Sequence, residues 1–323
     1  MRPKRILVAV ANPASRRSLA AEKAAAIARR SGAGITLFHS FYSPYVAGER
    51  FYDPAALEKD IAAAVELRKA QLDRLAAPLR DQGMEVFLRV RWDYPVHESL
   101  VREALREKSD LVVAESHRHG RLARVMLTNT DWQLIRLCPC PVLFVKNDRP
   151  HDKLKVLAAV DPLHAHAKPA SLDERLISEA ADYAALFTGQ LHVAHIHPRV
   201  TPLATGGIME PVALPVDVAR RHLLEVRKAF DALLRPYGVG PRRRHLQPGL
   251  PALDLPVLVG ELGAGLVVMG AVSRSGLKRL FIGNTAERVI DQLACDVLVI
   301  KPTDFRTSVP RQGSKRPVVL PPL

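Results

Sequence analysis

The chain alternates short apolar runs with longer stretches in which apolar residues recur at helical spacing. Runs such as Leu266–Met269 and Val297–Ile300 are apolar throughout, as is typical of strands that helices cover on both faces. The alternation predicts parallel sheets built from strand–helix–strand units. Strands are expected at 5–10, 34–40, 85–91, 110–115, 142–146, 155–160, 190–196, 242–247, 265–270 and 296–301. Helices are expected at 14–31, 54–82, 96–107, 128–138, 171–187, 215–235, 253–262 and 283–293.

The pattern occurs twice along the chain, because residues 111–146 align without a gap with residues 266–301. Identical pairs include Leu111/Leu266, Arg124/Arg279, Asn129/Asn284, Thr130/Thr285, Cys140/Cys295 and Lys146/Lys301. A period this long indicates a duplicated domain rather than a solenoid repeat. We therefore expect two α/β domains, at 1–149 and 150–308. The proline-rich and basic segment 309–323 is expected to be a disordered tail.

Length and composition narrow the class of protein. The 323 residues contain no apolar run of 18 or more, so no transmembrane helix is expected. The basic start Met1–Arg5 is followed by an apolar run too short for a secretory signal, so no export signal is expected. Three cysteines are too few for a disulfide framework in a chain of this size. A reducing, cytoplasmic location fits this cysteine usage.

The net charge is +14 and the pI is about 10. A basic surface attracts nucleic acid, anionic membranes and phosphate-bearing ligands without specifying any of them. The run Arg242–Arg244 falls in a predicted edge strand, where charged side chains discourage pairing with other chains. We favour a solvated basic surface and keep nucleic-acid binding as the alternative.

The segment Met269–Glu287 carries the most chemistry, because it follows a strand and opens a helix. Gly270 ends the strand, where backbone can pass close to a ligand. Gly283, Asn284 and Thr285 begin the helix, whose free N–H groups and positive dipole end favour an anion. The segment is not a P-loop, and no Gly-x-Gly-x-x-Gly turn follows the first strand of either half. These absences argue against P-loop nucleotidases and dinucleotide-dependent dehydrogenases.

At these positions the chain resembles a known family. Gly270, Ser273 and Gly283-Asn284 have the spacing of the Gly-2x-Gly-9x-Gly-Ser/Thr signature of universal stress proteins that bind ATP. The resemblance extends to about residue 308. It implies that each half has a Rossmann-like fold with a five-stranded parallel sheet of order 3-2-1-4-5. Ligands of such sheets bind outside the carboxyl ends of strands 1 and 4.

The resemblance also implies a ligand site in the second half. Its residues are Asp161, Met269, Gly270, Ser273, Gly283, Asn284 and Thr285. In relatives that bind ATP, an aspartate at the position of Asp161 contacts adenosine and the glycine loop holds the phosphates. The chain departs from the signature because Ser273 replaces a glycine and Asn284 replaces Ser or Thr. Three readings stay open: ATP with Mg, another small ligand, and an empty structural pocket.

The first half lacks the signature. By the same offset, Glu115 takes the place of Gly270 and Thr128 that of Gly283, while Asn12 stands where Asp161 stands. Glu115 brings a negative charge to the place where a phosphate would approach. The first domain is therefore expected to be degenerate, with no ATP bound in the manner of the family.

Three other groups of residues were weighed. His164, His166, His195 and His197 follow neighbouring strands, yet no cysteine accompanies them, so packing is favoured over zinc and no metal is predicted. Cys138-Pro-Cys140 resembles a redox pair, but Cys140 aligns with Cys295 at the start of a strand, which favours buried structural thiols. The aromatic residues between 41 and 52 either cover a pocket, meet a partner or anchor their own loop.

No catalytic base stands out, so we expect a protein that is not an enzyme. The resemblance implies a stress-response protein that binds a small ligand or a partner and promotes tolerance of stress, including DNA-damaging conditions. The alternatives are slow ATP hydrolysis and association with nucleic acid. The resemblance also implies pairing of the two halves within one chain, through strands such as Val297–Ile300, while a homodimer stays open.

Overall fold

A computed structural model describes residues 2–43, 53–116, 129–163, 171–198, 216–271 and 284–312. The chain separates into two compact units. The larger unit contains Arg2–His151 and Ala294–Leu323, and the smaller unit contains Asp152–Leu293. The sequence repeat and the compact units therefore differ at the last strand, which lies in the second repeat along the sequence and in the larger unit in space.

The larger unit is built on a sheet whose first five strands are parallel, in the predicted order β3-β2-β1-β4-β5. Its strands are β1 (Arg5–Ala9), β2 (Gly34–Phe41), β3 (Val86–Trp92), β4 (Leu111–Glu115), β5 (Val142–Val145) and β10 (Asp296–Ile300). β10 pairs antiparallel with β5, with Leu298 opposite Leu143. The last strand of the sequence thus completes this sheet.

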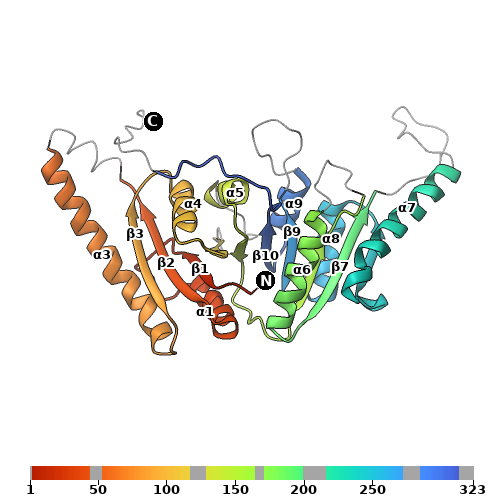
Figure 1. Ribbon diagram of the computed structural model, residues 1–323, viewed down its shortest axis with the longest axis horizontal. Coiled ribbons are helices and arrows are strands. Elements are labelled where there is room, and N and C mark those ends of the chain that lie inside the picture. Colours follow the sequence, from red (N-terminus) through yellow and green to blue (C-terminus); the bar gives the residue numbers. More distant parts are fainter. Residues whose placement is uncertain are drawn as a thin grey trace. The chain divides into compact units, whose positions relative to one another are not determined.

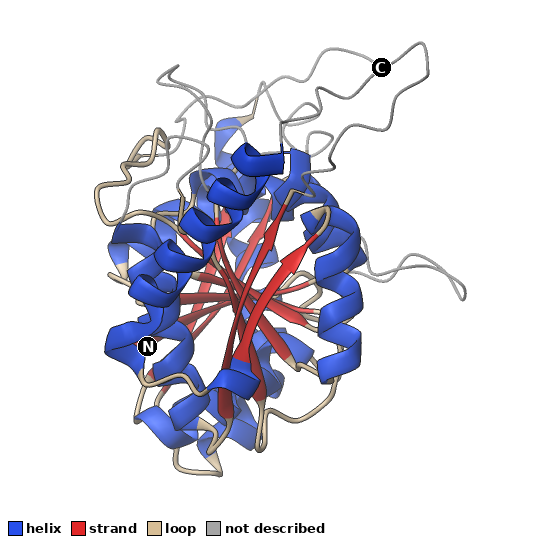
Figure 2. Ribbon diagram, turned by 90° about the vertical axis from the view of Figure 1, so that its right-hand side faces the viewer, coloured by secondary structure: helices blue, strands red, loops and turns tan. Residues whose placement is uncertain are grey.

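Helices cover both faces of this sheet (Figure 1), and in Figure 2 the strands of the chain lie between helices on both sides. They are α1 (Leu19–Ser31), α3 (Pro54–Arg80), α4 (Val96–Arg106) and α5 (Asn129–Leu137). α1 and α3 pack on the central and edge strands, while α4 and α5 pack against each other (Figure 1). The central strands β4, β5 and β10 are buried at almost every position, which explains their largely apolar sequences. The edge strand β3 is partly exposed and contains two arginines.

The smaller unit repeats the same plan with four parallel strands in the order β8-β7-β6-β9. The strands are β6 (Lys155–Ala159), β7 (Gln190–His197), β8 (Arg244–Pro248) and β9 (Leu266–Gly270). The helices are α6 (Ser171–Leu186), α7 (Val216–Leu234), α8 (Pro251–Leu262) and α9 (Asn284–Gln292), with short 3₁₀ turns at Arg235–Tyr237 and Pro241–Arg243. The order of these strands agrees with the Rossmann-like prediction.

A buried polar cluster holds β10 in the larger unit. Asp296, which is 0% exposed, accepts hydrogen bonds from the backbone N–H of Lys146 (2.8 Å) and from Nε2 of His151 (2.7 Å). Nζ of Lys23, on α1, lies 2.9 Å from the same carboxylate. Burial lowers the pKa of His151 against the hydrogen bond to Asp296, which raises it. The carboxylate thus joins β10 to α1 and to the end of β5.

The start of the first helix differs from the prediction, because α1 begins at Leu19 and not at residue 14. The side chain of Asn12 accepts a hydrogen bond from the backbone N–H of Ala14 (3.0 Å), which forms a turn instead. Ser18 then caps the helix by accepting the N–H of Ala21 (3.3 Å). Local side-chain hydrogen bonds therefore take these residues out of the helix.

Within the described residues, no helix combines the length and apolar character needed to cross a bilayer. Residues 302–312 follow β10 without regular structure, and Val309 among them is buried. Residues 313–323, the rest of the predicted tail, lie outside the described residues.

Candidate functional site

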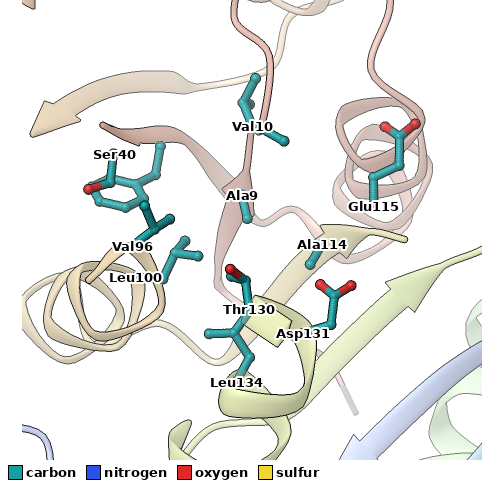
Figure 3. A pocket seen from close by; sticks show the side chains of 12 residues that line it. Ala9, Val10, Ser40, Val96, Leu100, Ala114, Glu115, Thr130, Asp131 and Leu134 are labelled. Atoms are coloured by element: carbon teal, nitrogen blue, oxygen red, sulfur yellow. The ribbon is translucent and has the colours of Figure 1, made fainter. Parts of the chain in front are cut away.

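The described residues enclose a cavity of about 290 Å³ in the larger unit. It lies where β1 and β4 end, and α4 and α5 form its other walls (Figure 3). Adjacent parallel strands end here with their helices on opposite faces, which opens a crevice at the crossover point of such sheets. The sequence signature pointed to the second half, whereas this cavity lies in the first.

Most of the cavity wall is apolar, and the polar groups that line it are hydroxyls and carboxylates. Val96 and Leu100 come from α4 and Leu134 from α5. The polar side chains at the cavity are those of Ser40, Glu115, Thr130 and Asp131 (Figure 3). No positively charged side chain is present among the described residues that line it. The cavity therefore offers a ligand apolar contact and hydrogen-bond acceptors.

Carboxylates stand at the positions in the first half that align with the predicted phosphate site of the second half. Glu115 Oε2 accepts the backbone N–H of Leu19 (3.0 Å), so its charge lies at the positive end of α1. Asp131 is 4% exposed and sits in the first turn of α5, the helix whose counterpart was predicted to receive phosphate. Two carboxylates at this place disfavour an anion. The degeneracy of the first domain stays a prediction.

The predicted site in the second half is described only in part. Asp161 lies two residues after the end of β6. Met269 and Gly270 end the neighbouring strand β9, where Met269 pairs with Ala159. Ser273 and Gly283 lie outside the described residues. Asn284 and Thr285 open helix α9, as the sequence predicted. Binding of a ligand by these residues stays a prediction.

Gly270 has a packing role that the sequence did not reveal. A Cβ atom at this position would lie 2.9 Å from Cδ2 of Leu172 and 3.5 Å from Cδ1 of Leu176, both on α6. Real Cβ atoms do not approach other atoms as closely as the first distance. The close approach of α6 to β9 therefore accounts for a glycine here independently of any ligand.

Asp173 is a site neighbour that sequence reasoning missed. Its fully buried carboxylate, in the first turn of α6, accepts the backbone N–H of Asp161 (3.2 and 3.3 Å). It thereby fixes the backbone at the end of β6. An acidic residue in the first turn of a predicted helix is the one signal that could have pointed to it.

His39 in β2 and His195 in β7 have a structural role. Nδ1 of His195 donates to the carbonyl of Val160 (2.9 Å), and Nδ1 of His39 donates to the carbonyl of Val10 (2.8 Å). The same bond thus links the second strand of each half to the end of its first strand. His164 and His166 lie outside the described residues, within which no group of three or more candidate ligands could hold a metal ion.

A second histidine pair lies between β7 and β8. Nδ1 of His192 and Nε2 of His245 are 3.0 Å apart, and the rings stack with centroids separated by 5.3 Å. His192 is buried, and its Nε2 has no hydrogen-bond partner among the described residues. Burial, and then the charges of His245, Lys155 and Arg243, lower the pKa of His192 to about 4.

This pair predicts acid sensitivity of the smaller unit. An unfolded histidine has a pKa near 6.5, so below that pH the unfolded state binds a proton that the folded His192 does not. Stability should fall between pH 7 and pH 5, by roughly 1–2 kcal/mol. Urea unfolding followed by circular dichroism at both pH values measures the loss. The loss should shrink in His192→Leu and persist in His222→Leu, on α7; equal losses in the two variants would contradict the assignment.

The aromatic cluster after β2 extends to residues that the sequence did not group with it. Phe41 meets Trp92 edge-to-face at 5.1 Å between ring centroids, and Tyr42 packs against Trp92 and Tyr94 at 5.2 and 5.4 Å. The guanidinium of Arg68 lies 3.7 Å from the centre of the Phe41 ring. Tyr45, Phe51 and Tyr52 lie outside the described residues. The described part of the cluster anchors the end of β2 to β3 and α3.

Comparison with known proteins follows the internal repeat. Residues 3–146 and 154–301 each match the family described as the universal stress protein family. The chain is 34% identical over 249 residues to universal stress protein E of Escherichia coli strain K12. This alignment covers 76% of this chain and 77% of that protein. It is 28% identical over 308 residues to universal stress protein E of Photorhabdus laumondii, covering 94% and 96% of the two chains.

Solved structures share the fold. A protein from Pseudomonas aeruginosa PAO1, described as functionally unknown, superposes with a TM-score of 0.73 at 30% identity, over 94% of each chain. A universal stress protein from Archaeoglobus fulgidus gives a TM-score of 0.64 at 14% identity, over 93% of this chain and 99% of that one. The second likeness concerns the fold alone.

Proposed function

Because the chain belongs to the universal stress protein family and carries two of its domains in tandem, we propose that it is a stress-response protein that acts by binding a small ligand. In this proposal the protein is cytoplasmic and not an enzyme, and it promotes tolerance of stress that includes DNA damage. The cavity at the ends of β1 and β4 is the observation that supports ligand binding.

The chemistry of the cavity supports a ligand without phosphate in the first half. Val96, Leu100 and Leu134 contribute apolar surface, and the carboxylates of Glu115 and Asp131 accept hydrogen bonds and repel anions. A neutral or cationic molecule with an apolar body matches these groups. At about 290 Å³ the volume lies at the lower end of the range for small-molecule sites.

The proposal also includes binding of a nucleotide by the second half. Its support is the spacing of Gly270, Ser273 and Gly283, which resembles the ATP signature of the family, and the position of Asp161 just after β6, the strand that pairs with β9. ATP would enter with Mg, as in relatives that carry the full signature. Slow hydrolysis is the alternative activity, and release of phosphate from Mg-ATP tests it.

The repeat supplies matched variants for the first-half cavity. Ala114 lines the cavity, and the residue aligned with it in the second half is Met269. Ala114→Met should fill part of the space and expel the ligand, since the added side chain enters an existing void. Native mass spectrometry of the purified full-length protein measures what co-purifies. A ligand retained in Ala114→Met, in the amount found for the wild type, would place it outside this cavity.

The matched change in the second half is Gly270→Glu, which copies Glu115. It should weaken Mg-ATP binding by at least roughly tenfold, because a buried negative charge would face the phosphates. The contact of the new Cβ atom with Leu172 adds a steric cost to this variant. Gly270→Ala carries the same crowded Cβ without the charge, so it is the control in calorimetric titrations. Equal affinities of Gly270→Glu and Gly270→Ala would contradict a phosphate at this position.

A further inference from the structure

The sulfur atoms of Cys138 and Cys140 lie 3.4 Å apart, at the junction between α5 and β5. The backbone N–H of Cys138 donates to the carbonyl of Leu134 (2.9 Å), which fixes Cys138 to the last turn of α5. Cys138 is 1% exposed, whereas Cys140 is only half-buried. The two thiols are therefore in contact, and a small oxidant would reach the buried Cys138 sulfur from the side of the half-buried Cys140.

A buried ammonium group lies beside this pair. Lys301, at the end of β10, is 2% exposed, and its Nζ donates to the carbonyl of Arg136 (2.9 Å), two residues before Cys138. The same Nζ lies 4.3 Å from the centre of the Phe305 ring. Burial lowers the pKa of Lys301 to about 8, against the negative charge of Cys138, which raises it.

The thiols differ in acidity for a physical reason. A hydrogen bond from the Cys140 thiol lowers the pKa of Cys138, and the charge of Lys301 lowers it further, while burial opposes both. The same hydrogen bond raises the pKa of Cys140, as does burial. The pair therefore favours a thiolate at Cys138 with a protonated thiol at Cys140, which is the arrangement of an attacking and a resolving cysteine.

We propose that Cys138 and Cys140 form an oxidation site at which a hydroperoxide converts the two thiols to an intrachain disulfide. The Cys138 sulfur attacks the peroxide oxygen and forms a sulfenic acid, while the leaving alkoxide or hydroxide takes up a proton. The Cys140 sulfur then attacks the Cys138 sulfur and releases water. Overall, two thiols and ROOH give one disulfide, ROH and water.

The site is coupled to the cavity by its position. Forming the bond requires the sulfurs to approach from 3.4 Å to about 2.05 Å, which constrains Cys138 at the end of α5 and Cys140 before β5. Leu134, which accepts the N–H of Cys138, lines the cavity. Disulfide formation would therefore change the position of Leu134 in the cavity wall, one turn of α5 away.

The test uses the reduced full-length protein with hydrogen peroxide as the probe, followed by denaturation, alkylation of free thiols and peptide mass spectrometry. We expect the peptide with Cys138 and Cys140 to resist alkylation, to have lost two hydrogen atoms, and to regain both thiols with dithiothreitol. Cys295 should stay free and should be dispensable, so Cys295→Ser should react like the wild type. Full alkylation of Cys138 and Cys140 after peroxide, or a disulfide that involves Cys295, would overturn the proposal.

Two lysine variants keep the test independent of cysteine substitution. Lys301→Met should slow disulfide formation at pH 7 by up to roughly tenfold and shift its pH profile to higher pH, because the thiolate loses a neighbouring positive charge. Lys146→Met removes the equally buried lysine that aligns with Lys301 in the repeat, and it should leave the rate and the profile unchanged. Identical pH profiles for Lys301→Met and the wild type would refute the positioning role of Lys301.

Discussion

Replacing Asp296 with alanine should lower the free energy of unfolding of the larger unit by roughly 3–5 kcal/mol. The carboxylate is fully buried and accepts hydrogen bonds from His151 and from the backbone of Lys146, while Lys23 lies against it. Removing it leaves the Lys23 ammonium buried without its counter-charge. The variant should also release β10 from β5 before the rest of the sheet unfolds.

Tryptophan fluorescence during urea unfolding measures this loss, because both tryptophans, Trp92 and Trp132, belong to the larger unit. Asp304→Ala, an exposed aspartate that follows β10, is the matched control and should change stability by less than about 0.5 kcal/mol. Bonds from His151 and the charge of Lys23 lower the pKa of Asp296 against burial, which raises it. The stabilisation is therefore present above about pH 4 and disappears as the pH falls through the lowered pKa. A midpoint for Asp296→Ala equal to that of Asp304→Ala would show that this cluster contributes nothing.

Replacing Arg102 with leucine should cost the larger unit about 3 kcal/mol or more. Arg102 lies on α4 and is 1% exposed, with Nη2 2.9 Å from Asp93 and Nη1 2.9 Å from Glu98. Its removal leaves the carboxylate of Asp93 largely buried without its cation. Val96 and Leu100 of the same helix line the cavity. The variant should therefore also destabilise this side of the cavity and weaken the binding of any ligand there.

Arg106 on the same helix is the control for Arg102. Its side chain is 43% exposed, and Glu103, its partner, also contacts Arg89 and Arg91. Arg106→Leu should therefore cost less than about 1 kcal/mol. If Arg102→Leu and Arg106→Leu unfold at the same urea concentration, burial of the Arg102 pair does not govern the stability of α4.

The fold was predictable from the sequence because local patterns agree with the packing. Continuous apolar strands and the internal repeat specify parallel α/β sheets, and the predicted strand order is observed. The start of α1 was not predictable from periodicity, because the Asn12 turn and the Ser18 cap decide it. The antiparallel pairing of β10 with β5 was not predicted, since the sequence of an apolar strand does not specify its partner. Family resemblance implied only that strands such as Val297–Ile300 pair the two halves.

The site was less predictable because its features arise from contacts between distant residues. The glycine signature led to Gly270, yet the approach of Leu172 explains that glycine as well. Glu115 was expected only to repel phosphate, whereas its carboxylate also caps α1 through Leu19. The contact between Cys138 and Cys140 could be suspected from their spacing, but the buried lysine beside them comes from a strand more than 150 residues later.

The position of β10 has a consequence for synthesis on the ribosome. β5 forms early, but its partner β10 emerges only after roughly 150 further residues, which takes about 10–30 s at typical elongation rates. During that interval the nascent chain exposes the unpaired edge at Val142–Val145, together with the Lys23 site that Asp296 later occupies. An open edge of this kind is a template for pairing between chains on neighbouring ribosomes. The first repeat should therefore depend on chaperones until translation of the second is almost complete.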